Sequence, residues 1–190
     1  PVINALTDLS HPCQAMADFL TLREHKGALS ALKLTYVGDG NNVCHSLMLA
    51  AARGGTKMAV ATPPGYEPKP EVVKWAREDG KDTGFALTLT TSPEEAVAGA
   101  DAVYTDVWAS MGQESEKEAR ARIFAPYQVN ARLMAHAKKD TLFMHCLPAH
   151  RGDEVTDEVI DSPNSVVYDE AENRLHAQKA ILIALMGDKD

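Results

Sequence analysis

The chain has 190 residues, of which 45% are hydrophobic and 24% are charged, and this composition is typical of one globular domain or of one domain with a fragment of another. Its formal net charge of −8 argues against a nucleic-acid-binding surface, which needs clustered lysine and arginine. The sequence contains no run of about 20 apolar residues, so we expect no membrane span.

The first 27 residues are predicted to connect two domains. Residues 1–4 (Pro-Val-Ile-Asn) have strand character, and a helix is expected over 11–26, which starts behind Ser10 and Pro12 and ends at Gly27. The start lacks an initiator Met and the features of a signal peptide. We therefore expect a piece of a longer protein, in which residues 1–27 are the end of one domain plus an interdomain helix.

Five short β-type runs alternate with helical patterns through the rest of the chain. The runs cover 32–38, 57–62, 85–90, 102–108 and 141–147. The helices are expected at 42–53, 70–79, 93–99, 114–137 (broken near Pro126) and 171–186. Strands separated by helices indicate right-handed crossovers and a parallel sheet covered on both faces. The fold class is therefore α/β, a doubly wound Rossmann-like three-layer sandwich with a parallel five-stranded sheet in the order 3-2-1-4-5.

Polar loops follow the first, fourth and fifth predicted strands, at 38–42, 106–114 and 145–152. In open parallel sheets, ligands bind outside the carboxyl ends of the strands, where the strand order reverses. Because strands one and four are neighbours at that point, the three loops are expected to converge on one crevice. This convergence predicts a small-molecule site.

The first of these loops, Gly-Asp-Gly-Asn-Asn, partly matches a dinucleotide-binding fingerprint. Val43 occupies the third glycine position, and the second strand ends without an acidic residue for a ribose hydroxyl. We therefore favour a small ligand held by the carboxamide of Asn41 or Asn42. For Asn41 the preferred interpretation is that it shapes the turn and caps the next helix.

The second loop begins with Asp106, which could bind a ligand amine or serve equally well as a helix cap or a surface charge. The following Ser110-Met111-Gly112 is an unusual loop sequence, because an apolar Met between small residues normally packs against something. This sequence favours the interpretation that the loop is a mobile lid, which closes over a small substrate.

The third loop contains Cys146, which could be a nucleophile, a metal ligand or an inert thiol. A nucleophile needs a base, and the adjacent His145 is expected to point to the opposite face of its strand. Neither this pair nor His11 with Cys13 has the spacing of a metal site, so we expect no metal. The three cysteines are too few and too far apart for a disulfide framework and fit a reducing cytoplasm.

Four motifs together resemble those of the ornithine carbamoyltransferases, and the resemblance covers essentially the whole chain. The sequence Glu170-Ala171-Glu172-Asn173-Arg174, before the expected last helix, fits the same family. The four motifs are Ser10-His11-Pro12-Cys13-Gln14, Asp39-Gly40-Asn41-Asn42, Asp106-Val107-Trp108-Ala109-Ser110-Met111-Gly112 and His145-Cys146-Leu147-Pro148.

The resemblance implies transfer of a carbamoyl group from carbamoyl phosphate to L-ornithine, giving L-citrulline and phosphate without a metal or organic cofactor. By position, His11, Gln14, Arg174 and the backbone carbonyl of Leu147 would hold the carbamoyl group. Such a reaction serves arginine biosynthesis, the urea cycle or arginine catabolism, and these residues are common to the anabolic and catabolic directions.

On the ornithine side, the resemblance assigns Asn42, Asp106, Ser110 and Met111 to the α-amino and carboxylate groups. Cys146, beside Asp106, would orient the attacking δ-amine in its neutral form. The catalytic residues implied are therefore His11, Gln14, Asp106, Cys146 and Arg174.

One part of the family pattern is missing, namely the Ser-Thr-Arg-Thr stretch that cradles the phosphate. The resemblance therefore implies an ornithine-binding domain over 28–170 and a C-terminal helix, 171–190, that packs toward an absent carbamoyl-phosphate domain. It also implies a homotrimeric full-length protein and little turnover by this chain alone. The alternatives are a carbamoyltransferase for another amine such as putrescine or acetylornithine, a non-catalytic binding module and a dinucleotide-binding oxidoreductase domain.

Overall fold

The computed structural model describes residues 1–109 and 117–187. The strands are β1 (Lys33–Val37), β2 (Lys57–Ala61), β3 (Leu87–Thr90), β4 (Ala102–Thr105) and β5 (Leu142–His145). The helices are α1 (Pro12–Lys26), α2 (Asn42–Gly54), α3 (Pro70–Gly80), α4 (Pro93–Val97), α5 (Lys117–Phe124), α6 (Ala131–Met134), α7 (Asp157–Ile160) and α8 (Val167–Met186). Two 3-10 helices are η1 (Leu29–Ala31) and η3 (Ala125–Tyr127).

The five strands form one parallel sheet in the order β3-β2-β1-β4-β5. Leu34 of β1 lies opposite Met58 on one side and Ala102 on the other, which makes β1 and β4 neighbours. The predicted α/β class and strand order are confirmed. The order reverses between β1 and β4, so the carboxyl ends of these strands open the crevice that the sequence predicted.

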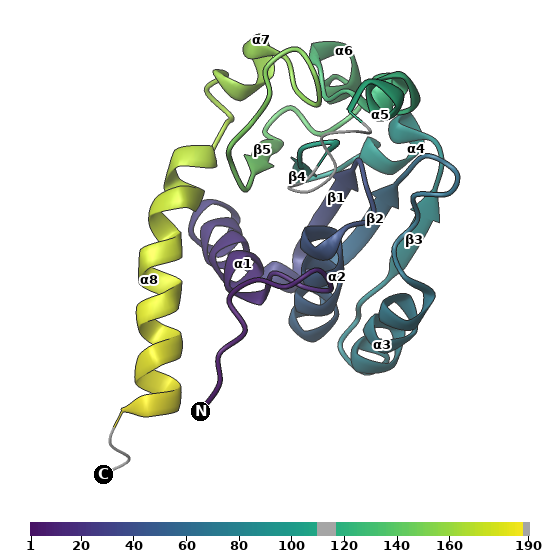
Figure 1. The fold of residues 1–190 in the computed structure, drawn as a ribbon. Coiled ribbons are helices and arrows are strands. Elements are labelled where there is room, and N and C mark those ends of the chain that lie inside the picture. Colours follow the sequence, from purple (N-terminus) through teal and green to yellow (C-terminus); the bar gives the residue numbers. More distant parts are fainter. Residues whose placement is uncertain (110–116, 188–190) are drawn as a thin grey trace.

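Helices cover both faces of the sheet, as Figure 1 shows. Alternate residues along each strand enter two different cores, because successive side chains point to opposite faces. Tyr36 and Met144 pack with α1, α2 and α3 in one core. Val37 and Phe143 pack with α4, α6 and α7 in the other. The four strands β1, β2, β4 and β5 are therefore largely buried on both sides, whereas the edge strand β3 is partly exposed, and the whole forms a three-layer sandwich.

The structure corrects two predicted elements. Residues 1–4 form no strand, because a strand needs a hydrogen-bonding neighbour and this segment has none within the described residues. The helix predicted over 114–137 is split at Pro126, as expected, but it does not resume at once. The chain is extended at Val129, and α6 begins only where the Asn130 side chain accepts a hydrogen bond from the Leu133 N–H.

The last helix, α8, begins at Val167 rather than at residue 171. Its N-cap Val166 makes no side-chain capping bond, so the usual start signal was missing from the sequence. Glu170 and Arg174 consequently lie inside the helix, and α8 packs along α1 (Figure 1). Within the described ranges, no helix is both long and apolar enough to cross a bilayer.

Candidate active site

A cavity of about 770 Å³ lies at the carboxyl edge of the sheet, outside β1, β4 and β5. Ser110 and Met111 fall outside the described residues. The other predicted site residues all line this cavity, and they are His11, Gln14, Asn42, Asp106, Cys146, Leu147 and Arg174. The structure therefore brings together residues from both ends of the chain and from three loops.

His11 lies at the N-cap of α1, where Pro12 begins the helix. Its backbone N–H donates to Ser46 Oγ at 2.7 Å, and its ring Nδ1 lies 2.7 Å from the Ala5 carbonyl oxygen. Because a carbonyl only accepts, Nδ1 carries a proton. Burial lowers the pKa of His11, and the nearby Arg174 lowers it further. In the neutral ring, Nε2 is then an acceptor, and it becomes a donor when the ring gains a second proton.

Asn41 caps α2, as preferred from the sequence, since its Oδ1 accepts from the backbone N–H groups of Val43 and Cys44. Its Nδ2 also donates to Asp106 Oδ2 at 2.7 Å, a role that sequence reasoning missed. Asn42 lines the cavity, and its Nδ2 donates to the Thr7 carbonyl at 2.8 Å. The two adjacent side-chain amides therefore have different partners. Asn41 binds the Asp106 carboxylate, and Asn42 binds the backbone of the N-terminal segment.

Gly40 is required by close packing rather than by a bound pyrophosphate. A Cβ at this position would lie 2.3 Å from the Pro68 backbone nitrogen. The Gly40 N–H also donates to the Tyr66 carbonyl at 2.9 Å. Protein backbone thus fills the space that the second glycine of a dinucleotide fingerprint leaves for its ligand. This packing argues against the oxidoreductase alternative.

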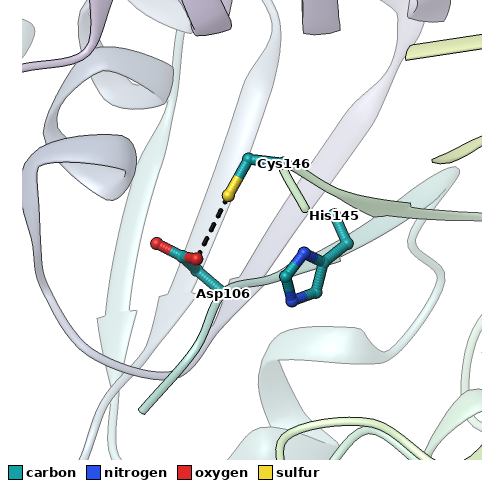
Figure 2. A group of neighbouring side chains, drawn as sticks. All are labelled: Asp106, His145 and Cys146. Carbon is teal, nitrogen blue, oxygen red and sulfur yellow. Dashed lines mark hydrogen bonds between the residues drawn. The ribbon is translucent and has the colours of Figure 1, made fainter. Parts of the chain in front are cut away.

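Asp106 is buried, so it is not a surface charge, and its carboxylate is the centre of the site. Oδ1 accepts from the Val107 N–H at 2.8 Å and from Cys146 Sγ at 3.1 Å, while Oδ2 accepts from Asn41. Figure 2 shows the Cys146 sulfur directed at this carboxylate, with the His145 ring beside it. The geometry makes Asp106 a hydrogen-bond acceptor facing the cavity.

Cys146 is a thiol in this arrangement rather than a thiolate. Burial raises the pKa of Cys146 well above its usual value, and the negative charge of Asp106 raises it further. A cysteine nucleophile needs the opposite effect, a lowered pKa beside a cation or a base. The geometry therefore makes Cys146 a hydrogen-bond donor to Asp106 rather than a nucleophile.

His145 is fully buried, and both of its ring nitrogens are engaged. Nδ1 accepts from the Leu147 N–H at 2.9 Å, so Nε2 carries the proton and donates to Glu154 Oε1 at 3.2 Å. The His150 N–H donates to the same Glu154 oxygen at 2.6 Å. Glu154 was not predicted, because nothing local in the sequence marks it as a partner of His145.

His145 and Cys146 come close together at the end of β5, although Cys146 packs against the core of Tyr36 and Met144, the face that strand alternation assigns to it. Their ligand-type atoms and the Asp106 carboxylate all lie within 4.8 Å of one another. β5 ends at His145, Leu147 adopts a φ of 54°, and the His145 ring folds back to accept from the Leu147 N–H. This spacing could accommodate a metal ion, but hydrogen bonds to Leu147, Glu154 and Asp106 already engage the same atoms.

Gln14 and Arg174 line the same cavity and are hydrogen-bonded to each other, although 160 residues separate them. The Arg174 guanidinium donates to Gln14 Oε1 at 2.5 Å. The Gln14 Nε2 donates to Asp18 Oδ1 at 2.8 Å and lies 3.4 Å from Glu170 Oε1. Sequence reasoning also missed Asp18, although an acidic residue within the largely apolar stretch 15–22 of α1 was a visible signal.

Comparisons with known proteins place these features in a family. The model described as the aspartate/ornithine carbamoyltransferase Asp/Orn binding domain matches residues 30–185. Ornithine carbamoyltransferase of Pyrococcus horikoshii is 62% identical over 187 residues, covering 98% of this chain and 59% of that protein. The ornithine carbamoyltransferase structure from Pyrococcus furiosus has a TM-score of 0.96 at 60% identity, covering 100% of this chain and 61% of that one.

A solved structure of acetylornithine transcarbamylase complexed with acetylcitrulline is more distant. It has a TM-score of 0.83 at 35% identity, covering 95% of this chain and 57% of that one. In both ornithine carbamoyltransferases above, the chain spans about three fifths of the relative's length. The family model alone matches well over half of the chain. The chain therefore belongs to the aspartate/ornithine carbamoyltransferase family and carries its Asp/Orn binding domain.

Proposed function

We propose that this chain is the ornithine-binding part of an ornithine carbamoyltransferase, which converts carbamoyl phosphate and L-ornithine to L-citrulline and phosphate. The observation that carries the proposal is a cavity lined by two hydrogen-bonded pairs of different chemistry. The first pair is the Asp106 carboxylate with the Cys146 thiol, and the second is the Gln14 carboxamide with the Arg174 guanidinium. The first suits an amine and the second suits a carbamoyl group.

On the amine side, Asp106 and Cys146 orient the δ-amine of ornithine. An alkylamine has a pKa of about 10.4 in water, and its ammonium form has no lone pair for attack. The Asp106 carboxylate accepts N–H hydrogens, so the remaining lone pair can face the carbamoyl carbon and a proton can be transferred as the bond forms. Asn42 and the undescribed Ser110 and Met111 keep their expected role with the α-amino and carboxylate groups.

On the carbamoyl side, Gln14 Oε1 accepts from the carbamoyl amide, and Arg174 donates to the carbonyl oxygen. The guanidinium then stabilises the oxyanion of the tetrahedral intermediate. His11 would donate to this oxygen from Nε2 when its ring gains a second proton, a form that the lowered pKa disfavours in the free site and that a developing oxyanion nearby would favour. The Leu147 carbonyl accepts from the amide, and its φ of 54° supports this role because strained backbone is often retained at functional sites.

The remaining parts of the proposal concern the whole protein. Residues 1–27 would link two domains, 28–170 would bind ornithine, and 171–190 would pack on the carbamoyl-phosphate domain. Exposed apolar side chains on α8 support the last assignment, and they are Leu175, Leu182, Ile183, Leu185 and Met186. A homotrimeric full-length enzyme follows from the family resemblance, and a cytoplasmic location is supported by the free cysteines Cys13, Cys44 and Cys146.

The test is citrulline formation from saturating ornithine and carbamoyl phosphate, measured for this chain alone and for the full-length protein that contains it. We expect turnover by the full-length protein and little by the chain, with circular dichroism showing that the chain is folded. Parallel assays replace ornithine with putrescine or acetylornithine. Faster carbamoylation of either of these amines would refute the assignment of ornithine.

Substitution of Cys146 by alanine in the full-length enzyme is expected to lower kcat by about 10²-fold, the lower range for a positioned proton-handling group. Loss of one partly buried thiol should cost less than about 2 kcal/mol in the free energy of unfolding. Cys146→Ser, which keeps a donor toward Asp106, is the matched control and should retain more activity. An unchanged kcat in Cys146→Ala would mean that the thiol is inert.

A further inference from the structure

A pair of buried carboxyl groups lies beneath the site and belongs to none of the roles above. Asp18 of α1 and Glu170 of α8 are both fully buried, and their carboxyl groups share the Gln14 Nε2 group as a neighbour and lie close enough to influence each other's pKa. Two neighbouring carboxylates in a buried site cannot both remain charged without a large cost in free energy. One proton on the pair would remove this cost and would allow one carboxyl to donate a hydrogen bond to the other.

The hydrogen bonds around the pair indicate where that proton lies. Asp18 Oδ1 accepts from Gln14 Nε2, whereas Asp18 Oδ2 has no hydrogen-bond donor among the described residues. Glu170 Oε2 accepts from the His145 N–H at 3.1 Å, whereas Oε1 has only the longer 3.4 Å contact with Gln14 Nε2, so Oε1 is the oxygen better placed to carry a proton. A protonated Glu170 would supply the donor that Asp18 Oδ2 lacks.

The charges facing the pair agree with a single negative charge on Asp18. The Arg174 guanidinium, from α8, favours the charged form of Asp18. The buried Tyr104 hydroxyl of β4 lies beside both carboxyls, and the neutral Cys146 thiol is close enough to be influenced by them. The negative charge of the Asp18 carboxylate is therefore balanced by the positive charge of the neighbouring Arg174 guanidinium.

Resting on the proposed function, we propose that Asp18 and Glu170 share one proton, carried by Glu170, and act as positioning residues for Gln14 and Arg174. The Gln14 amide must direct its NH₂ group at Asp18, so its Oε1 faces Arg174. The reversed amide would place NH₂ hydrogens against the guanidinium, where no acceptor exists. Through the His145 N–H, Glu170 also holds the main chain next to Cys146.

Burial supports this distribution of charge. It raises the pKa of Asp18 to about 6 and raises that of Glu170 well above its ordinary value, with the charge of Asp18 as a second cause. Near pH 7, Asp18 is then ionised and Glu170 is neutral. As the pH falls through about 6, Asp18 gains a proton and the Gln14 amide loses its charged acceptor. We expect kcat/KM for carbamoyl phosphate to fall with it.

The experiment compares Asp18→Asn with Glu170→Gln in the full-length enzyme. Glutamine reproduces a protonated Glu170, because its NH₂ donates to Asp18 and its oxygen accepts from His145. Asparagine at position 18 instead removes the charge and places an NH₂ group against the Glu170 proton. On the usual scale for groups that orient site residues, we expect Asp18→Asn to raise the KM for carbamoyl phosphate about 10- to 100-fold and Glu170→Gln less than about fivefold.

Two further readouts separate positioning from a purely structural role. The acidic limb of the pH profile should disappear in Asp18→Asn, and the KM for ornithine should change less than that for carbamoyl phosphate. Thermal unfolding verifies that each variant is folded. Equal losses in both variants, or the reverse order, would overturn the proposal.

Infrared spectroscopy tests the proton itself without any substrate. At pH 7, the folded protein should show the carbonyl stretch of a protonated carboxylic acid, which Glu170→Gln removes and the control Tyr104→Phe retains. Absence of this band in the unsubstituted protein would refute the shared proton. If the band is present but the full-length protein forms no citrulline, the proposed function fails while the protonated pair stands.

Discussion

Asp106→Asn in the full-length enzyme is expected to lower kcat/KM for ornithine by about 10²- to 10³-fold, corresponding to roughly 3–4 kcal/mol. The Asp106 carboxylate accepts hydrogen bonds from Val107, Cys146 and Asn41. An asparagine has one acceptor oxygen, so its NH₂ group must oppose either the Asn41 amide or the Cys146 thiol. The charge that attracts the substrate amine is lost as well.

The measurement is steady-state kinetics with each substrate varied in turn. The effect should be confined largely to ornithine, because the hydrogen-bonded pair Gln14 and Arg174 is untouched. Asp153→Asn is the matched control, since Asp153 also lines the cavity but has no role in the proposed reaction. Retention of ornithine affinity in Asp106→Asn would show that this loop does not bind the amine.

Glu154→Ala is expected to have the largest effect on stability, lowering the free energy of unfolding by about 3–5 kcal/mol. Glu154 is fully buried, and its Oε1 is the acceptor for the His145 ring and for the His150 N–H. Alanine leaves both donors without a partner and creates a cavity. The His145 ring would also lose the contact that holds it against the Leu147 N–H.

Urea unfolding at pH 7 gives this difference directly. Glu154→Gln is the control, because glutamine preserves one acceptor oxygen and the side-chain volume, and it should cost less than half as much. Equal destabilisation by the two substitutions would mean that the negative charge of Glu154, rather than its acceptor oxygen, is what His145 requires.

The fold was largely predictable because its strands are short, apolar and regularly separated by helices. A parallel strand buried on both faces has few alternatives, and β1 through β5 were found close to their predicted ranges. The wrong predictions have local causes. Residues 1–4 have strand composition but no pairing partner, and α8 begins at Val167 without a capping side chain.

The candidate site was only half predictable, for a different physical reason. Groups that face the cavity, such as Asp106 and Cys146, occur in loops directly after strands, where sequence position indicates function. Groups that act through another residue are determined by tertiary packing. The contact between Gln14 and Glu170 joins residues 156 positions apart. The contact between His145 and Glu154 joins residues 9 positions apart, on either side of a loop. No periodicity or spacing reveals such partners.

The packing of α1 against α8 also has a consequence for the order of folding during synthesis. Arg174 follows Gln14 by 160 residues, which corresponds to roughly 10–30 s on a ribosome adding about 5–20 residues per second. Throughout that interval the sheet can assemble, but Asp18 still faces water and ionises like any surface carboxyl. Docking of α8 must then desolvate Asp18 and Glu170 together. We expect this long-range closure to be a late step of folding, and one that captures a proton from the solvent.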